Sequence, residues 1–245
     1  MIFNIQNNMT KVIKITRYSL IILSGILLVI AVGSSVAAIL TPAWQTVYLA
    51  EFQSEHEHGL WIDCTITKKF IKGITHNTHC TYKFENGYMQ ESGIHPEEEQ
   101  HKFHEWHKVV LVLFGTAILS ALTALCFSFC ALCIRISAIV TNVTALIAAM
   151  SSSFAMAVFF ISSHRNDIRF VPGITYTYEQ TKGYSYYLGL GSMIAYIFAF
   201  IISVLATVMA FLHERQQNDT SNKSYPKSRL NGESPIPTGP TSIAV

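Results

Sequence analysis

Apolar residues in this chain are gathered into four long stretches. No Asp, Glu, Lys, Arg or His occurs within residues 18–50, 109–134, 136–163 and 183–212, and each stretch holds 26 to 33 residues. A helix needs about 20 apolar residues to cross the hydrocarbon core of a bilayer. The stretches also lack the period-two alternation of membrane β-barrel strands. We therefore predict four transmembrane helices, at residues 18–40, 108–133, 137–161 and 186–212.

The segments between these helices complete the predicted organisation. They are a basic N-terminus, a long loop, a tight turn, a second loop and a tail, at residues 1–17, 41–107, 134–136, 162–185 and 213–245. Lys11, Lys14 and Arg17 directly precede the first helix, and Lys and Arg are enriched in cytoplasmic flanks. We therefore expect a membrane protein with both termini in the cytosol and both loops on the opposite, outer side. The short turn makes the second and third helices antiparallel neighbours, and the Pro-rich polar tail should be disordered.

The first apolar stretch also permits a second interpretation. Residues 18–32 could form the core of a signal peptide, with residues 36–38 near its cleavage site. The apolar stretch continues to Leu40, which is longer than a typical signal core. This length favours a membrane helix.

Composition narrows the class of protein further. Hydrophobic residues make up 50% of the chain and charged residues only 13%, whereas a soluble domain carries about 25% charged residues. This excludes a soluble enzyme and a nucleic-acid binder. The four apolar stretches contain no Asp, Glu, Lys or Arg, the residues that mark proton relays and pumps within membranes. We find no nucleophile–base pair or phosphate-binding loop, and so we expect neither an enzyme nor a bound cofactor.

The first loop is expected to form a small disulfide-bridged sheet. Cys64 and Cys80 are its only cysteines, and disulfides persist in the oxidising space outside the cell. Period-two alternation places Leu60, Ile62, Cys64 and Ile66 on one face, and likewise Cys80, Tyr82 and Phe84. Residues 46–49 and 174–178, rich in β-branched and aromatic residues, are candidates for further strands.

Six residues of this loop resemble a known signature. Trp44, Gly59, Leu60, Trp61, Cys64 and Cys80 resemble the W…GLW-x-x-C…C pattern of the claudin superfamily, which includes peripheral myelin proteins, epithelial membrane proteins and calcium channel gamma subunits. Residues 184–189 are similar to the corresponding stretch of the gamma subunits, and the chain length and long first loop look closest to the Clc-like proteins of nematodes. The resemblance implies a left-handed four-helix membrane bundle that carries an extracellular antiparallel sheet, anchored by the tryptophans and the Gly-Leu-Trp triplet.

The same resemblance suggests the function. It implies a plasma-membrane protein that acts in cell–cell contact or barrier formation through the extracellular sheet. Alternatively, it implies an auxiliary subunit that modulates an ion channel or receptor. The expected partners are the lipid bilayer and membrane proteins of the same or an adjacent cell, with no nucleic acid. Two departures matter: the segment between the cysteines is longer than in claudins, and Thr81 stands where cation-selective claudins have an acidic residue. The second departure argues against cation selectivity at that position.

Three further groups of residues have candidate roles. His101, His104 and His107 lie at helical spacing and form a weak candidate site for zinc or, alternatively, for sensing extracellular acid. A solvated helix next to the membrane is the favoured interpretation. Cys126, Cys130 and Cys133 lie near the cytoplasmic end of the second helix, and Cys130 and Cys133 are candidates for palmitoylation. The chain ends in Ile243, Ala244 and Val245, which match the hydrophobic class of PDZ-domain ligand.

Overall fold

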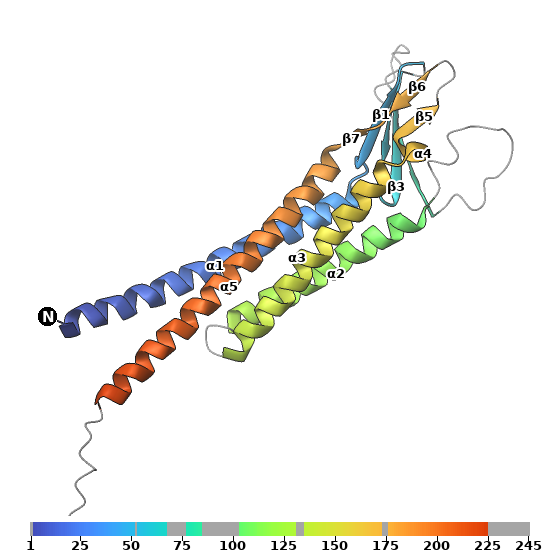
Figure 1. The fold of residues 1–245 in the computed structure, drawn as a ribbon. Helices are drawn as coiled ribbons and strands as arrows, with labels where there is room; N and C mark the ends of the chain where they lie inside the picture. The colour runs from blue at the N-terminus through green and yellow to red at the C-terminus, as the bar shows by residue number, and fades with distance from the viewer. Residues whose placement is uncertain are drawn as a thin grey trace, which may run out of the picture.

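Four long helices form a bundle with a small sheet at one end (Figure 1). The helices are α1 (Ile2–Leu40), α2 (Glu105–Cys130), α3 (Arg135–Ser163) and α5 (Tyr184–Ser224), and a single turn, α4 (Asn166–Arg169), follows α3. The computed structural model describes residues 2–51, 53–67, 77–84, 103–130, 135–172 and 176–224. We call the end of the bundle that carries the sheet the sheet end. The opposite end, where α1 begins and α5 ends, is the tail end.

Each long helix contains a stretch that is long and apolar enough to cross a membrane. The stretches are Lys11–Leu40, Glu105–Cys130, Ile136–Ser163 and Tyr184–Leu212. With the sheet, they confirm the predicted four-span membrane fold.

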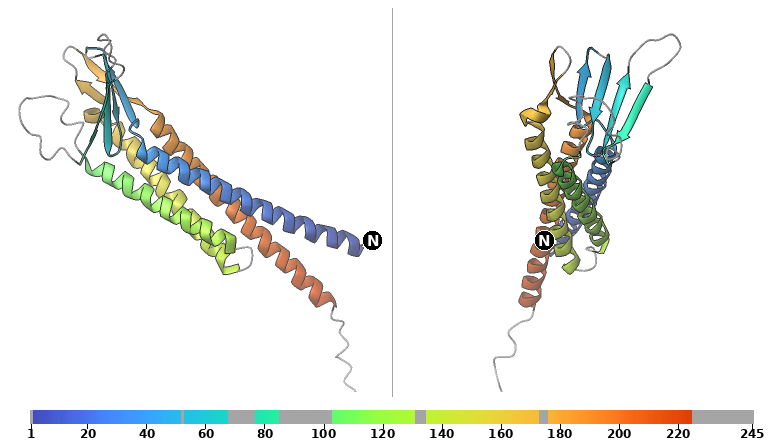
Figure 2. Two further views of the ribbon diagram at one scale, coloured as in Figure 1. Left: turned by 180° about the vertical axis from the view of Figure 1, so that it is seen from behind. Right: turned by 90° about the vertical axis from the view of Figure 1, so that its right-hand side faces the viewer.

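At the tail end, α1 and α5 run beyond α2 and α3 (Figures 1 and 2). Helix α5 continues to Ser224, so the first part of the segment expected to be disordered is helical. The sequence offers a reason, because no Gly or Pro occurs between His213 and Ser224 and the next proline is Pro226. Glu, Arg and Gln in this part are good helix formers.

Small residues allow the helices to pack closely. The central core consists mainly of buried alanines, with Leu28 and Tyr196 as its large members. On α2 these alanines are Ala117, Ala121 and Ala124, at the spacing of one helix face. Small residues let helix backbones approach each other in membranes, and here α1 lies beside α5 while α2 lies beside α3 (Figure 1).

The sheet is antiparallel and is built from both loops. Its strands are β1 (Gln45–Leu49), β2 (Ser54–His58), β3 (Ile62–Thr67), β4 (Asn77–Tyr82) and β7 (Thr181–Lys182), in the order β4-β3-β2-β1-β7. A separate hairpin pairs β5 (Phe170–Pro172) with β6 (Thr177–Glu179). Residues 46–49 therefore form a strand, and residues 177–178 of the second candidate strand lie in β6, whereas residues 174 and 175 lie outside the described residues. Strand β2 was not predicted.

The register of the sheet defines two faces. Cys64 lies opposite Cys80 and the two form a disulfide, with Ile62, Ile66 and Tyr82 on the same face. On the other face, Val47 and Leu49 of β1 pack against Val171 and Tyr178 of the hairpin. The second loop thus packs against the face opposite the disulfide.

Candidate functional site at the junction of sheet and helices

The two signature tryptophans bind the last turn of α1. The carbonyls at the end of a helix have no partner within the helix. Here the indole N–H of Trp44 donates to the carbonyl of Ala38, and that of Trp61 donates to the carbonyl of Ile39, both at 2.7 Å. The tryptophans therefore cap α1 at the point where the chain leaves the bundle and enters the sheet.

Trp44 also lies in the hydrophobic core at the sheet end of the bundle. It is fully buried, and its ring lies 4.7 Å from that of Phe159 on α3 and 5.9 Å from that of Phe114 on α2, measured between centroids. On α5, a Cβ added at Gly189 would lie 3.0 Å from Cη2 of Trp44. One indole thus contacts all three other long helices while it caps the first.

The Gly-Leu-Trp triplet forms the tight connection between β2 and β3. A Cβ added at Gly59 would lie 2.5 Å from the carbonyl oxygen of Ile62 and 2.9 Å from Cα of Pro42. The amide of Gly59 donates to this same carbonyl, at 3.0 Å, and Leu60 is fully buried. Only glycine fits at position 59, because two backbone segments approach it.

A buried group of charged and polar side chains lies next to this connection. It consists of His58, Asp63, Lys83 and His107, which we call the junction cluster. Nζ of Lys83 lies 3.3 Å from Oδ1 of Asp63 and 3.2 Å from Nε2 of His107. The same carboxylate oxygen accepts the amide N–H of Gly59 at 3.1 Å, and Nδ1 of His58 lies 3.6 Å away. The cluster therefore joins the Gly-Leu-Trp connection, the end of β4 and the start of α2.

Burial governs the electrostatics of the junction cluster. Desolvation lowers the pKa of Lys83 from its ordinary value, and the charge and hydrogen bond of Asp63 act in the opposite direction. An ammonium group in such a place depends on its partners, because an unpaired buried charge is costly. Lys83 and Asp63 thus stabilise each other as a pair.

This cluster was not predicted from the sequence, although part of its signal was present. Asp63 is out of phase with Ile62, Cys64 and Ile66, and Lys83 is out of phase with Tyr82. Alternation alone therefore places both charges on the face opposite the disulfide. The contact of Lys83 with His107, 24 residues further along the chain, had no signal in the local pattern.

The histidines considered as a zinc site do not all lie on the solvated helix that the sequence predicts. His107 is buried and holds the ammonium of Lys83 at its Nε2, so a cation there would have to displace another cation. The ring of His104 stacks 5.9 Å from that of His107, and His101 lies outside the described residues. Within the part of the chain that the structure describes, no three His, Cys, Asp or Glu side chains are grouped so that they could hold a metal.

The face of the sheet that carries the disulfide exposes aromatic side chains. Tyr48 on β1 and Tyr82 on β4 are both about half exposed, and Glu55, Glu57 and Ile66 lie between them in the register. We call this surface the disulfide face. Burial, and then the charge of Glu55, raises the pKa of Glu57 above its ordinary value.

The candidate cysteines that the structure describes lie away from this junction. Cys126 and Cys130 are exposed near the end of α2, at the tail end. Cys133, Ile243, Ala244 and Val245 lie outside the described residues. Palmitoylation and PDZ binding stay predictions.

Together, these features define a class of protein: a four-span membrane protein in which a disulfide-bridged antiparallel sheet is fastened to the bundle by Trp44 and the Gly-Leu-Trp connection. Comparison with known proteins agrees. A family model described as Clc-like matches residues 18–215. The chain is also 28% identical over 222 residues to "Clc-like protein 2" of Caenorhabditis elegans, covering 85% of this chain and 81% of that protein. The chain belongs to the Clc-like family, which confirms the resemblance drawn from its signature residues.

Proposed function

We propose that this protein lies in the plasma membrane with both termini in the cytosol and acts in cell–cell contact or barrier organisation through its sheet. The orientation is supported by two observations at opposite ends of the bundle. The disulfide between Cys64 and Cys80 at the sheet end requires an oxidising compartment. Lys11, Lys14 and Arg17 at the tail end match the basic flank of a cytoplasmic segment.

The observation that carries the contact role is the exposure of aromatic rings on a firmly held sheet and on the hairpin that packs against its other face. Tyr48 on the disulfide face and Tyr176 beside the β5–β6 hairpin expose large rings beyond the helices. Aromatic residues are enriched in protein–protein interfaces. A sheet anchored by two indole caps and a buried ion pair presents these rings with little entropic cost of ordering on binding.

A cell-mixing experiment tests this role. Cells that express the protein with one fluorescent label are mixed with cells that express it with another, and enrichment at shared borders is measured. We expect enrichment only where two expressing cells touch, and its loss in a Tyr48→Ser, Tyr176→Ser double variant. Tyr18→Ser is the matched control, because Tyr18 is 47% exposed at the tail end and Tyr48 is 49% exposed at the sheet end. Uniform surface distribution of the unmodified protein would contradict the contact role.

A second role, modulation of an ion channel or receptor, is favoured by the start of α5. Tyr184 and Tyr187 lie one turn apart on this helix and both are exposed. They are part of the stretch that resembles the gamma subunits, and they lie where a neighbouring membrane protein would contact the bundle from the side. Altered currents of a co-expressed channel that return to normal with Tyr184→Ala, Tyr187→Ala would support this role. Unchanged currents across a panel of channels would contradict a modulatory role.

We further propose a lipid anchor on Cys130 and Cys133 and a scaffold ligand formed by the last residues of the sequence, Ile243, Ala244 and Val245. Cys130 is exposed near the membrane boundary, which is where palmitoylated cysteines lie. Acyl-exchange labelling should detect lipid that Cys130→Ser and Cys133→Ser together abolish. A pull-down with PDZ domains should depend on residues 243–245, and binding that survives their deletion would exclude this ligand.

A further inference from the structure

Lys182 of β7 is held among aromatic rings at the sheet end of the bundle. Its Nζ lies 5.2 Å from the ring centroid of Phe159 and 5.9 Å from that of Phe160, both on α3. On α5, the ring centroid of Tyr186 lies 5.5 Å away. The faces of such rings attract a cation, and the same ammonium donates a hydrogen bond to the hydroxyl of Ser163. One lysine thus joins the edge of the sheet to the end of α3 and the start of α5.

The groups in contact with this ammonium are all uncharged. Within the described residues, Lys182 forms no ion pair with a carboxylate. An ammonium has three N–H donors, and the Ser163 hydroxyl accepts only one of them. Burial lowers the pKa of Lys182 from its ordinary value, and the nearby charge of Arg169 lowers it further. The described part of the chain therefore leaves the charge of Lys182 without an anion.

The ammonium lies at the level where two membrane spans end. Ser163 is the last residue of the apolar stretch of α3, and Tyr184 is the first residue of that of α5. On the last turns of α3, Phe160 is about half exposed and Ile161 is largely exposed. Lysines near the ends of membrane helices extend toward the lipid headgroups. Lys182, which is itself partly exposed, thus lies between lipid-facing apolar side chains and the polar sheet.

We propose that Lys182 binds the phosphate of a phospholipid whose acyl chains pack against Phe160 and Ile161. The ammonium donates to the phosphate oxygens with the N–H groups that Ser163 does not use, and such charge-assisted hydrogen bonds are the strong ones. Soluble phosphate esters carry the same group, but only a lipid also covers the exposed apolar side chains. The proposal does not depend on the orientation of the bundle, because it concerns whichever leaflet lies next to the sheet.

Lipid retention by the purified full chain tests this proposal. The probes are phosphatidylcholine, diacylglycerol with the same acyl chains and soluble glycerophosphocholine, each counted by native mass spectrometry. We expect strong retention of phosphatidylcholine alone, because diacylglycerol lacks the phosphate and glycerophosphocholine lacks the acyl chains. Lys182→Gln should weaken retention of phosphatidylcholine about tenfold, as expected for one lost hydrogen bond between charged groups. Lys182→Arg keeps the charge and should keep the lipid.

Lys108→Gln is the matched control. Lys108 lies on α2 at the same end of the bundle, and its Nζ also lies near an aromatic ring, 5.5 Å from the centroid of Phe103. It differs from Lys182 in having a carboxylate, because its Nζ lies 2.6 Å from Oε1 of Glu105. We therefore expect Lys108→Gln to retain phosphatidylcholine as the unmodified chain does. Equal weakening by Lys108→Gln and Lys182→Gln would reduce the effect to general electrostatic attraction and overturn the proposal.

A second variant tests the proposal if Lys182→Gln does not fold. The exposed carboxylate of Glu179 accepts a hydrogen bond from Nε of Arg169 at 2.8 Å. Glu179→Gln removes this negative charge, so the charge of Arg169 adds to that of Lys182 and retention of phosphatidylcholine should rise about twofold. Unchanged or weaker retention by Glu179→Gln would overturn the proposal. Equal retention of diacylglycerol and phosphatidylcholine by the unmodified chain would exclude recognition of the phosphate, and equal binding of glycerophosphocholine would assign the site to soluble phosphate esters.

Discussion

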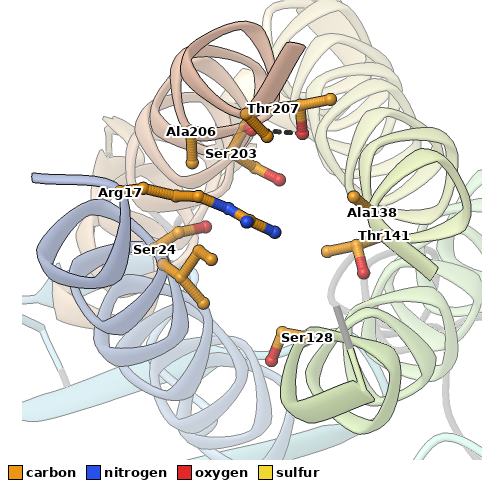
Figure 3. A pocket seen from close by; sticks show the side chains of 10 residues that line it. Arg17, Ser24, Ser128, Ala138, Thr141, Ser203, Ala206 and Thr207 are labelled. Atoms are coloured by element: carbon orange, nitrogen blue, oxygen red, sulfur yellow. Dashed lines mark hydrogen bonds between the residues drawn. The ribbon is translucent and has the colours of Figure 1, made fainter. Parts of the chain in front are cut away.

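At the sheet end of the bundle, the last carbonyls of α1 accept hydrogen bonds from two indoles, and a buried ion pair ties β4 to the neighbouring strand. At the tail end, α1 and α5 run on beyond α2 and α3 (Figure 2), and a pocket lined by Arg17 and several hydroxyls lies between the helices. The two ends thus use polar groups differently. The sheet end holds a buried ion pair, whereas at the tail end neutral groups bond between helices: Ser203 donates to Asn142, which donates to Thr207. The side chain of Arg17 is directed in among the hydroxyls of this end (Figure 3).

This difference has a consequence for stability. A polar group that is buried and paired contributes to the fold through the cost of breaking the pair. A hydrogen bond between neutral groups contributes less, about 0.5–1.5 kcal/mol. We therefore expect substitutions that break the ion pair at the sheet end to destabilise the protein more than substitutions of the neutral groups at the tail end. The predictions that follow test the sheet end, from the largest expected effect to the smallest.

Breaking the buried ion pair should have the largest effect. Lys83→Met leaves the carboxylate of Asp63 buried without its cation, and such a loss costs about 3–5 kcal/mol of the free energy of unfolding. Detergent denaturation of the purified full chain measures it. The double variant Asp63→Asn, Lys83→Met should recover much of the loss, because the remaining amide is neutral and still offers an oxygen to the Gly59 amide. Strictly additive losses would show that the two side chains do not act as a pair.

The close approach at Gly59 gives the next largest effect. Gly59→Ala places a Cβ 2.5 Å from the Ile62 carbonyl oxygen, so the β2–β3 connection must shift away from Pro42. Overpacking of this kind costs about 1–3 kcal/mol. Gly25→Ala is the control, since a Cβ there meets no atom within 4 Å. Thermal unfolding should separate the two variants clearly, and equal melting temperatures would contradict the assigned role of Gly59.

The indole caps should contribute less than the turn. Trp61→Phe keeps an aromatic ring but removes the N–H that the Ile39 carbonyl accepts, which costs about 1 kcal/mol. Trp106→Phe is an informative control, because its buried indole N–H makes no hydrogen bond within the described residues. That variant should be neutral or slightly stabilising. A larger loss for Trp106→Phe than for Trp61→Phe would show that ring packing, not capping, determines the effect.

The helices and the signature residues could be predicted because their signals are local. A run of apolar residues needs no partner to define a membrane helix, and the spacing of Trp44, Gly59, Trp61 and the cysteines is a property of the chain alone. Strand β2 was not predicted because its sequence, Ser-Glu-His-Glu-His, is polar on both faces and has no apolar alternation. It is a strand because β1 and β3 pair with it on either side.

The junction cluster could not be predicted for a related reason. The local pattern assigns Asp63 and Lys83 to one face of the sheet but does not tell what covers that face. The local pattern predicts a solvated helix that includes His101, His104 and His107. Only the packing of α2 next to the sheet brings His107 to Lys83. Likewise, Arg17 was interpreted only as an orientation signal, because its direction into the bundle depends on the rotation of α1.

The smallest expected effect lies on the disulfide face, at Glu57. Burial and the charge of Glu55 raise its pKa above 4.5, so the folded state binds the proton more tightly than the unfolded state does. Its contribution to stability is therefore fully present below pH 4.5 and is lost as the pH rises through the raised pKa. Glu57→Gln should then be more stable than the unmodified protein at pH 7 and equal to it near pH 4, by less than about 1 kcal/mol because the side chain is partly exposed. Melting temperatures measured from pH 4 to 7 check this, and Glu55→Gln should produce part of the same gain. If the melting temperatures of Glu57→Gln and the unmodified protein change with pH in parallel, the carboxyl of Glu57 is as well solvated in the folded state as in the unfolded state. That result would contradict the raised pKa of Glu57.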